Sequence, residues 1–131
     1  MKRPEGFGGM RHVALRVRDL EACERFYVGL LGMQVEWRPD ADNLYLTSGN
    51  DNLALHRATQ TLAADGQRLD HLGIVLRAAR YVDEWCEFLK SHDVSIAQAP
   101  KTHRDGARSF YCRDPEGTLV QFIHHPPIAG K

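Results

Sequence analysis

The sequence predicts an α+β protein made of two copies of one βαβββ module. Two segments of seven residues resemble each other, RHVALRV from Arg11 and DHLGIVL from Asp70, and each has a histidine in its second position. Each segment has the pattern of a strand and is followed by a stretch with the apolar spacing of an amphipathic helix. Because repeated units fold alike, His12 and His71 are expected at equivalent positions of a paired fold that brings them together.

The first module begins with a strand at 12–17, in which alternate residues are apolar and face the helices. Asp19 is a plausible N-cap for a helix that runs through about Leu30, and Gly32 is a suitable left-handed stop. Three further strands are predicted, at 33–38, 43–47 and 52–57, with a tight turn at 48–51.

The second module repeats this order. Its opening strand has an apolar face of Leu72, Ile74 and Leu76, and a helix follows at about 79–91. Three strands then complete the module, at 94–98, 107–112 and 118–124, with a turn at 113–117 and a linker between the modules at 61–67.

The composition is that of one globular domain covering residues 1–131, with modules at about 10–60 and 68–125. Lys and Arg number 17, as do Asp and Glu, and no basic stripe is present, so nucleic acid is not an expected partner. The chain has no signal-peptide pattern and no apolar run near the roughly 18 residues of a membrane span, so no membrane association and a cytoplasmic location are expected. The three cysteines form no CxxC pair and are expected as free thiols.

Strand alternation predicts a common site. If the apolar face of every strand packs on the helices, the opposite faces form a concave surface. The polar and aromatic side chains predicted on that surface are His12, His71, His56, Gln121 and Tyr111. Four aromatic residues are interpreted as core residues, namely Trp37, Trp85, Phe26 and Phe88. Alternation also places Arg57 on the buried face of its strand, but it lies at the strand end. The remaining histidines are interpreted as solvated surface or terminal residues.

Four motifs in the same order resemble the vicinal oxygen chelate superfamily, which includes glyoxalase I, extradiol dioxygenases and bleomycin resistance proteins. They are HVALRVRDL at 12–20, FYVGLLGM at 26–33, DHLGI at 70–74 and DPEGTLVQF at 114–122. The resemblance covers roughly 10–125 and implies two βαβββ modules that form a U-shaped mixed sheet around a cavity. It also implies a divalent metal (Fe, Mn, Zn or Ni) held by residues of the first and fourth strands of each module.

Carried over by position, the resemblance assigns His12, His71 and Gln121 as metal ligands. The remaining fourth-strand position matches Ala54, or His56 if the register shifts by two. Metal-binding members usually have glutamate where this chain has Gln121, so the donor set is neutral and binds a divalent ion more weakly. Gln121 as a hydrogen-bonding pocket residue is the alternative.

A metal with neighbouring open positions can chelate two vicinal oxygens of a substrate and stabilise the charge that develops on them. The resemblance therefore implies a metal-dependent lyase or isomerase, or an extradiol-type dioxygenase, acting on a small molecule. Gln121 cannot accept a proton at neutral pH, so His56 or a bound hydroxide would have to replace the usual glutamate base. The alternatives are a metal-free binding protein of the bleomycin-resistance type and a thiol transferase acting on an epoxide.

The expected assembly is a homodimer, because modules of short family members commonly pair across a two-fold axis. The family resemblance leaves open whether His12 and His71 meet within one chain or across the dimer. The sequence does not identify the substrate.

Overall fold

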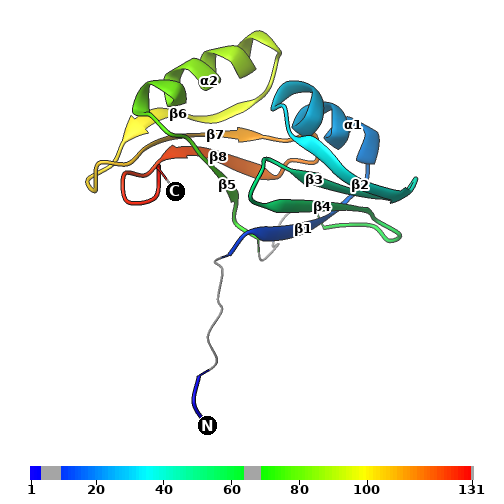
Figure 1. Cartoon of the computed structure of the whole chain (residues 1–131). Helices are drawn as coiled ribbons and strands as arrows, with labels where there is room; N and C mark the ends of the chain where they lie inside the picture. The colour runs from blue at the N-terminus through cyan, green and yellow to red at the C-terminus, as the bar shows by residue number, and fades with distance from the viewer. Residues whose placement is uncertain (4–9, 64–68, 131) are drawn as a thin grey trace. The chain divides into compact units, whose positions relative to one another are not determined.

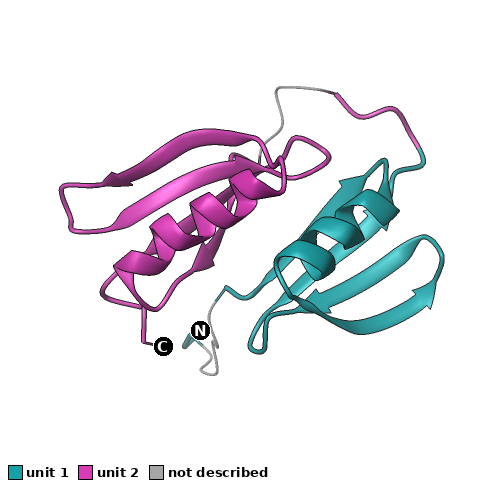
Figure 2. Ribbon diagram, turned by 90° about the horizontal axis from the view of Figure 1, so that it is seen from above, with its two compact units in different colours: residues 1–59 teal, residues 60–131 magenta. Residues whose placement is uncertain are grey.

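The computed structural model describes residues 1–3, 10–63 and 69–130, and the chain divides into two compact units, residues 1–59 and 60–131 (Figure 2). In each unit a helix covers one face of a four-stranded sheet (Figure 1). The predicted α+β class and the two βαβββ modules are thereby confirmed. The U shape and the shared cavity concern the relation between the units and stay predictions.

Unit 1 has the sheet order β1-β4-β3-β2, in which β1 is parallel to β4 and the other neighbours are antiparallel. Its elements are β1 (His12–Val17), α1 (Leu20–Glu24), η1 (Arg25–Leu30), β2 (Gln34–Asp40), β3 (Asn43–Thr47) and β4 (Asn52–Arg57). Unit 2 has the matching order β5-β8-β7-β6, with β5 parallel to β8. Its elements are β5 (Leu72–Val75), α2 (Ala79–Ser91), β6 (Ile96–Thr102), β7 (Arg108–Arg113) and β8 (Leu119–His124).

The helical segment of unit 1 begins as predicted but changes its hydrogen bonding halfway. Asp19 caps α1 by accepting a hydrogen bond from the Ala22 amide at 2.9 Å. From Arg25 to Leu30 the chain is π-helical rather than α-helical, so the single predicted helix is corrected to two successive segments. In this wider turn the neighbouring Phe26 and Tyr27 are both buried, with perpendicular rings whose centroids are 4.9 Å apart. Gly32 then ends the segment with φ +82°, as predicted.

The edge strands β2 and β6 extend beyond the predicted ranges 33–38 and 94–98. Both contain irregularities in their pairing with β3 and β7, where a bulge interrupts the alternation of side chains. Both also contain a proline, Pro39 or Pro100, which lacks an amide donor and is tolerated at a sheet edge. The alternation rule therefore places these strands less accurately than the central ones.

The buried faces of the sheets match the predicted parity. Leu53 and Leu55 of β4 are buried, as are Phe110, Val120 and Phe122 of unit 2. Two of the aromatic residues predicted in the core are exposed instead. One lies on an edge strand and the other on the side of a helix that faces away from the sheet, so no further layer covers them. They are Trp37, whose exposure is 58%, and Phe88, whose exposure is 41%.

The three cysteines, Cys23, Cys86 and Cys112, are free and buried. Burial raises the pKa of the Cys112 thiol to about 12, so this side chain is an inert core residue. The predicted linker 61–67 extends into residues 64–68, which lie outside the described part of the chain. In the described ranges, no helix combines the length and the apolar character needed to cross a bilayer.

Candidate functional site

Each sheet has a face that its helix does not cover, called here its open face. In unit 1 this face carries His12 on β1 and Ala54 and His56 on β4, because Leu53 and Leu55 point to the core. In unit 2 it carries Tyr111 on β7 and Gln121 on β8, which are direct partners in the ladder. Each unit thus presents part of the predicted site on its own open face.

The strand registers decide which residue of unit 1 is equivalent to Gln121. Gln121 pairs with Gly73, which lies two residues after His71. In unit 1 the residue two positions after His12 is Ala14, and its partner is Ala54. Ala54 is therefore the equivalent position, whereas His56 lies two residues further along β4. Unit 1 offers a methyl group where unit 2 offers an amide.

The imidazole of His12 is oriented by a hydrogen bond to the neighbouring strand. His12 Nδ1 lies 2.7 Å from Asn52 Oδ1, and Asn52 Nδ2 donates to Glu36 Oε2 at 3.2 Å. Because the Asn52 amide nitrogen is used by Glu36, its oxygen faces His12, so His12 Nδ1 is the donor. The proton on Nδ1 leaves Nε2 of this exposed histidine with a free lone pair.

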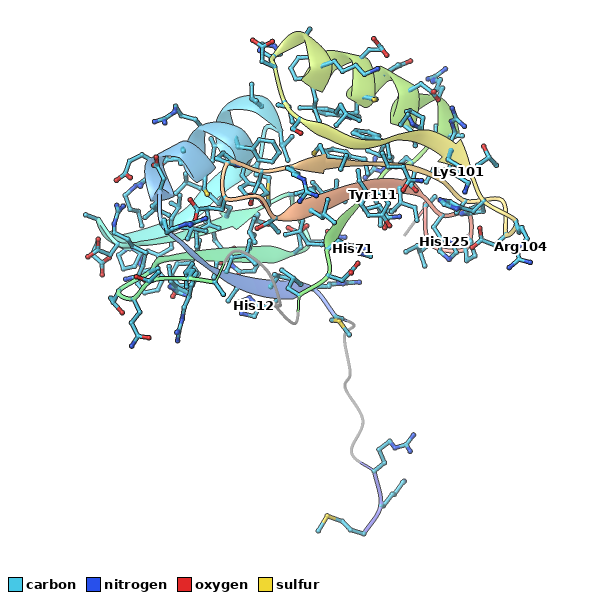
Figure 3. The ribbon with its side chains drawn as sticks, turned by 180° about the vertical axis from the view of Figure 1, so that it is seen from behind. His12, His71, Lys101, Arg104, Tyr111 and His125 are labelled. Atoms are coloured by element: carbon cyan, nitrogen blue, oxygen red, sulfur yellow. The ribbon has the colours of Figure 1, made fainter. Side chains whose placement is uncertain are left out.

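His71 also donates a hydrogen bond through Nδ1, but its partner is a different residue. The Nδ1 atom of His71 lies 2.6 Å from Asp70 Oδ2, and an ionised carboxylate only accepts. The His71 ring also makes an edge contact with the Tyr111 ring, whose centroid is 5.3 Å away at an angle of 87° (Figure 3). Both contacts hold the imidazole plane and leave Nε2 available, which is the arrangement that metal-ligating histidines adopt.

Gln121 extends toward the strand that follows His71. A Cβ atom built on Gly73 of β5 would lie 4.0 Å from Gln121 Oε1, so the amide oxygen lies over this glycine. The structure thus brings His71, Tyr111 and Gln121 to one open face in unit 2. His12 and His56 share the open face of unit 1.

His56 is held by a short relay on β3. Its Nδ1 lies 2.6 Å from Asn43 Oδ1, and the Asn43 amide nitrogen donates to both carboxylate oxygens of Asp40. Hydrogen bonds from the backbone of Asp42 and from Asn43 hold the pKa of Asp40 below its usual range, so the relay ends on an anion. Nδ1 of the half-buried His56 is thus engaged by Asn43, and Nε2 is the ring nitrogen that this relay leaves available.

Sequence reasoning missed an aromatic group on the open face of unit 1. Tyr45 pairs with Ala54, as Tyr111 pairs with Gln121, so the two tyrosines are equivalent. Trp37 stacks on Tyr45 with centroids 5.2 Å apart, and Tyr45 meets His56 edge-on at 5.8 Å. The alternation of side chains within 43–47 could have placed Tyr45 on this face. The bulge before Trp37 breaks the alternation, so the face of Trp37 could not be predicted in the same way.

Arg57 lies outside this group. It forms salt bridges with Glu21 at 2.6 Å and Asp42 at 2.8 Å, and it donates to the Ala41 carbonyl. Through these contacts the guanidinium joins α1 to the β2–β3 turn. The position of Arg57 at the end of β4 brings its side chain within reach of both. The Arg57 hydrogen bonds lower the pKa of Glu21 from 4.5 to about 2.

This shift predicts a stability difference that depends on pH. A group with a lowered folded-state pKa stabilises the fold above its unfolded pKa and loses that effect as the pH falls through the folded value. The wild type should therefore melt at a higher temperature than Glu21→Gln at pH 6, and the gap should close between about pH 4.5 and pH 2. Thermal denaturation at both ends of this range measures the effect, which high salt should weaken because Glu21 is exposed.

Glu84→Gln on α2 is the control, because Glu84 forms no salt bridge within the described ranges. A gap that stays constant down to pH 2 for Glu21→Gln would contradict the assigned role of Arg57.

The donor set fits a weak metal site rather than a strong one. Within residues 1–3, 10–63 and 69–130, no three histidine, cysteine, aspartate or glutamate side chains converge as a metal site. In His12 and His71, Nε2 is the ring nitrogen that the hydrogen bonds of Nδ1 leave available, and Gln121 presents a neutral amide oxygen. Two imidazoles and one amide suit first-row divalent ions but lack the anionic oxygen that strengthens such sites.

Comparison with known proteins agrees with this architecture. The family model described as the Glyoxalase/Bleomycin resistance protein/Dioxygenase superfamily matches residues 9–122. No protein in the curated set matches the chain significantly.

Among solved structures, lactoylglutathione lyase from Agrobacterium tumefaciens is similar, with a TM-score of 0.77, 20% identity, and coverage of 92% of this chain and 96% of that chain. A glyoxalase-related enzyme from Fulvimarina pelagi gives a TM-score of 0.74 at 20% identity, covering 92% of this chain and 90% of its own. An integron cassette protein from the mobile metagenome of Halifax Harbour sewage outfall gives 0.77 at 23% identity, covering 91% and 100%. At these identities the likeness shows the fold alone.

Proposed function

Because the chain belongs to the Glyoxalase/Bleomycin resistance protein/Dioxygenase superfamily, we propose that it is a metal-dependent enzyme acting on a small molecule with vicinal oxygens. One observation carries the proposal. His12 and His71, at equivalent positions of the two modules, each have Nδ1 engaged by an oxygen acceptor, which leaves Nε2 free. Metal-ligating histidines typically have this arrangement, in which the other ring nitrogen donates to an oxygen acceptor.

In the proposed site, His12 and His71 would hold a divalent ion through Nε2, and Gln121 would add its amide oxygen. When bound, the ion acts as a Lewis acid toward two neighbouring substrate oxygens. The proposed ligands come from both units, His12 from unit 1 and His71 and Gln121 from unit 2.

Proton transfer is assigned to His56, because Gln121 has no basic atom at neutral pH. The Asp40–Asn43 relay fixes the His56 proton on Nδ1, so Nε2 is the atom that accepts a proton from the substrate. Tyr111, in contact with the His71 ring, offers a phenolic hydroxyl that can donate to a substrate oxygen. These roles suit the removal of a proton next to a carbonyl, as in a lyase or isomerase.

A calorimetric titration with Mn²⁺ tests the proposal on protein purified without a histidine tag. The wild type should release or absorb heat with a defined stoichiometry, and His12→Ala and His71→Ala should each abolish the signal, because each removes one of two imidazole ligands. His125→Ala is the matched control, since it removes a histidine outside the proposed set and should leave binding unchanged. Equal binding by the wild type and both site variants would contradict the assignment.

Mixing the two site variants distinguishes the two possible assemblies. If the site forms across a dimer, a heterodimer of His12→Ala and His71→Ala chains regains one site with both histidines, so co-refolded mixtures should recover part of the Mn²⁺ binding. If the site forms within one chain, the mixture should bind no more than either variant.

A metal-free binding protein for planar aromatic compounds is the second candidate. Its support is the stacked Trp37–Tyr45 pair, in which an exposed indole lies against Tyr45, the ladder partner of Ala54. Aromatic faces of this kind bind planar ligands by stacking. Absence of Mn²⁺ binding by the wild type would favour this candidate.

A further inference from the structure

Unit 2 contains a hollow beside Gln121 that the metal ligands do not account for. Its volume is about 610 Å³, and its lining comes from the end of β6, the β6–β7 loop and β8. The lining residues are Lys101, Thr102, His103, Arg104, Asp105, Ala107, Gln121 and Ile123. All of them belong to unit 2, so the hollow is a property of this unit alone.

The loop that walls the hollow is held in one conformation by its own hydrogen bonds. The His103 amide donates to the Ala107 carbonyl at 2.7 Å, and the Gly106 amide donates to the His103 carbonyl at 3.0 Å. Gly106 has φ +88°, which a glycine adopts without strain. The His103 ring is fixed as well, since its Nε2 lies 3.0 Å from Oγ of the buried Ser109. The loop is therefore a formed wall.

The charges on this wall are unbalanced. Lys101 and Arg104 are exposed, and their side chains have no salt bridge or hydrogen bond within the described part of the chain. They lie at the same end of unit 2 (Figure 3). The single carboxylate there, Asp105, accepts a hydrogen bond from the Ala107 amide through Oδ1. The neighbouring Arg108 shows the contrast, because both carboxylate oxygens of Asp83 bind it.

The floor of the hollow adds neutral groups. Gln121 contributes an amide with two N–H donors, and Ile123 contributes an apolar surface. Two cations and an amide donor around a partly apolar floor form a receptor for an anion attached to an organic body. Gln121 links this receptor to the proposed metal site, since the same side chain belongs to both.

We propose that this hollow binds the anionic group, a carboxylate or a phosphate, of the small molecule on which the protein acts. Its assignment to the substrate rests on the proposed function. Lys101 and Arg104 neutralise the group, and Gln121 lies between that group and the vicinal oxygens. The substrate class is therefore an acidic metabolite with two neighbouring oxygens at some distance from its acid group.

Amide chemical shifts of chelator-treated protein test the hollow without any metal. Inorganic phosphate and acetate are titrated separately at constant ionic strength. Either anion should shift the amide resonances of residues 101–107 and 121–123. The double variant Lys101→Ala/Arg104→Ala should bind at least about tenfold more weakly, because it removes both charge-assisted donors. A response to phosphate or to acetate identifies which source of the anionic group the hollow prefers.

The control is Arg80→Ala/Lys90→Ala, which removes the same charge from α2 and should retain binding. The absence of shifts at residues 101–107 and 121–123, or an equal loss in both double variants, would overturn the proposal. Because no metal is present, anion binding by a protein that fails the Mn²⁺ titration would refute the metal site alone. Mn²⁺ binding without anion binding would refute the hollow alone.

Discussion

Gln121→Glu is expected to raise the affinity for Mn²⁺ by about tenfold or more, because an anionic oxygen replaces a neutral amide oxygen of nearly the same size. The side chain already extends over Gly73 on the open face of unit 2, and a carboxylate there needs no backbone change. Calorimetric titration of the variant beside the wild type measures the gain. Combining the change with His71→Ala should remove it.

Gln98→Glu provides a matched control for the added charge. Gln98 pairs with Tyr111 on the neighbouring strand, so this variant places the same carboxylate in the same unit without replacing a proposed ligand. A gain confined to Gln121→Glu identifies direct coordination. If both variants gain equally, or if neither does, Gln121 is a pocket residue and its assignment as a metal ligand is wrong.

Phe122→Ala is expected to lower the free energy of unfolding by about 4 kcal/mol, in the range for removal of a buried aromatic ring. Phe122 is 1% exposed and lies between two aromatic partners in unit 2. Its ring stacks on Phe110 with centroids 4.9 Å apart and on Trp85 at 5.8 Å. Urea denaturation followed by circular dichroism measures the change.

Phe88→Ala on α2 is the comparison, because that ring is 41% exposed. It should lower the free energy of unfolding by about 1 kcal/mol or less, since solvent already reaches the ring. Similar losses for the two variants would mean that the aromatic stack contributes little beyond ordinary surface packing.

The central elements could be predicted from the sequence because their patterns are regular. The ranges 43–47, 52–57 and 79–91 coincide with β3, β4 and α2. A tight turn joins the first two, and helical spacing marks the third. The edge strands were predicted too short because their bulges add residues that break the period of two.

The strand faces of the candidate residues could be predicted from the sequence, but their supporting contacts could not. The repeat and the strand parity placed His12, His71 and Gln121 on open faces, since parity depends only on counting residues. The partners that fix the histidine protons, such as Asn52 and Asn43, come from neighbouring strands whose register the sequence does not state. The exposed cations of the hollow lie on a bulged strand and a loop, where no periodicity applies.

The edge prolines have a consequence for how the sheets can grow. Each sheet has one outer strand with a proline and bulges, β2 or β6, and backbone of that kind is a poor template for another strand. The opposite outer strand of each sheet, β1 or β5, contains neither. An extended peptide that joined either sheet would therefore add beside the strand that His12 begins or that His71 precedes, next to a proposed metal ligand.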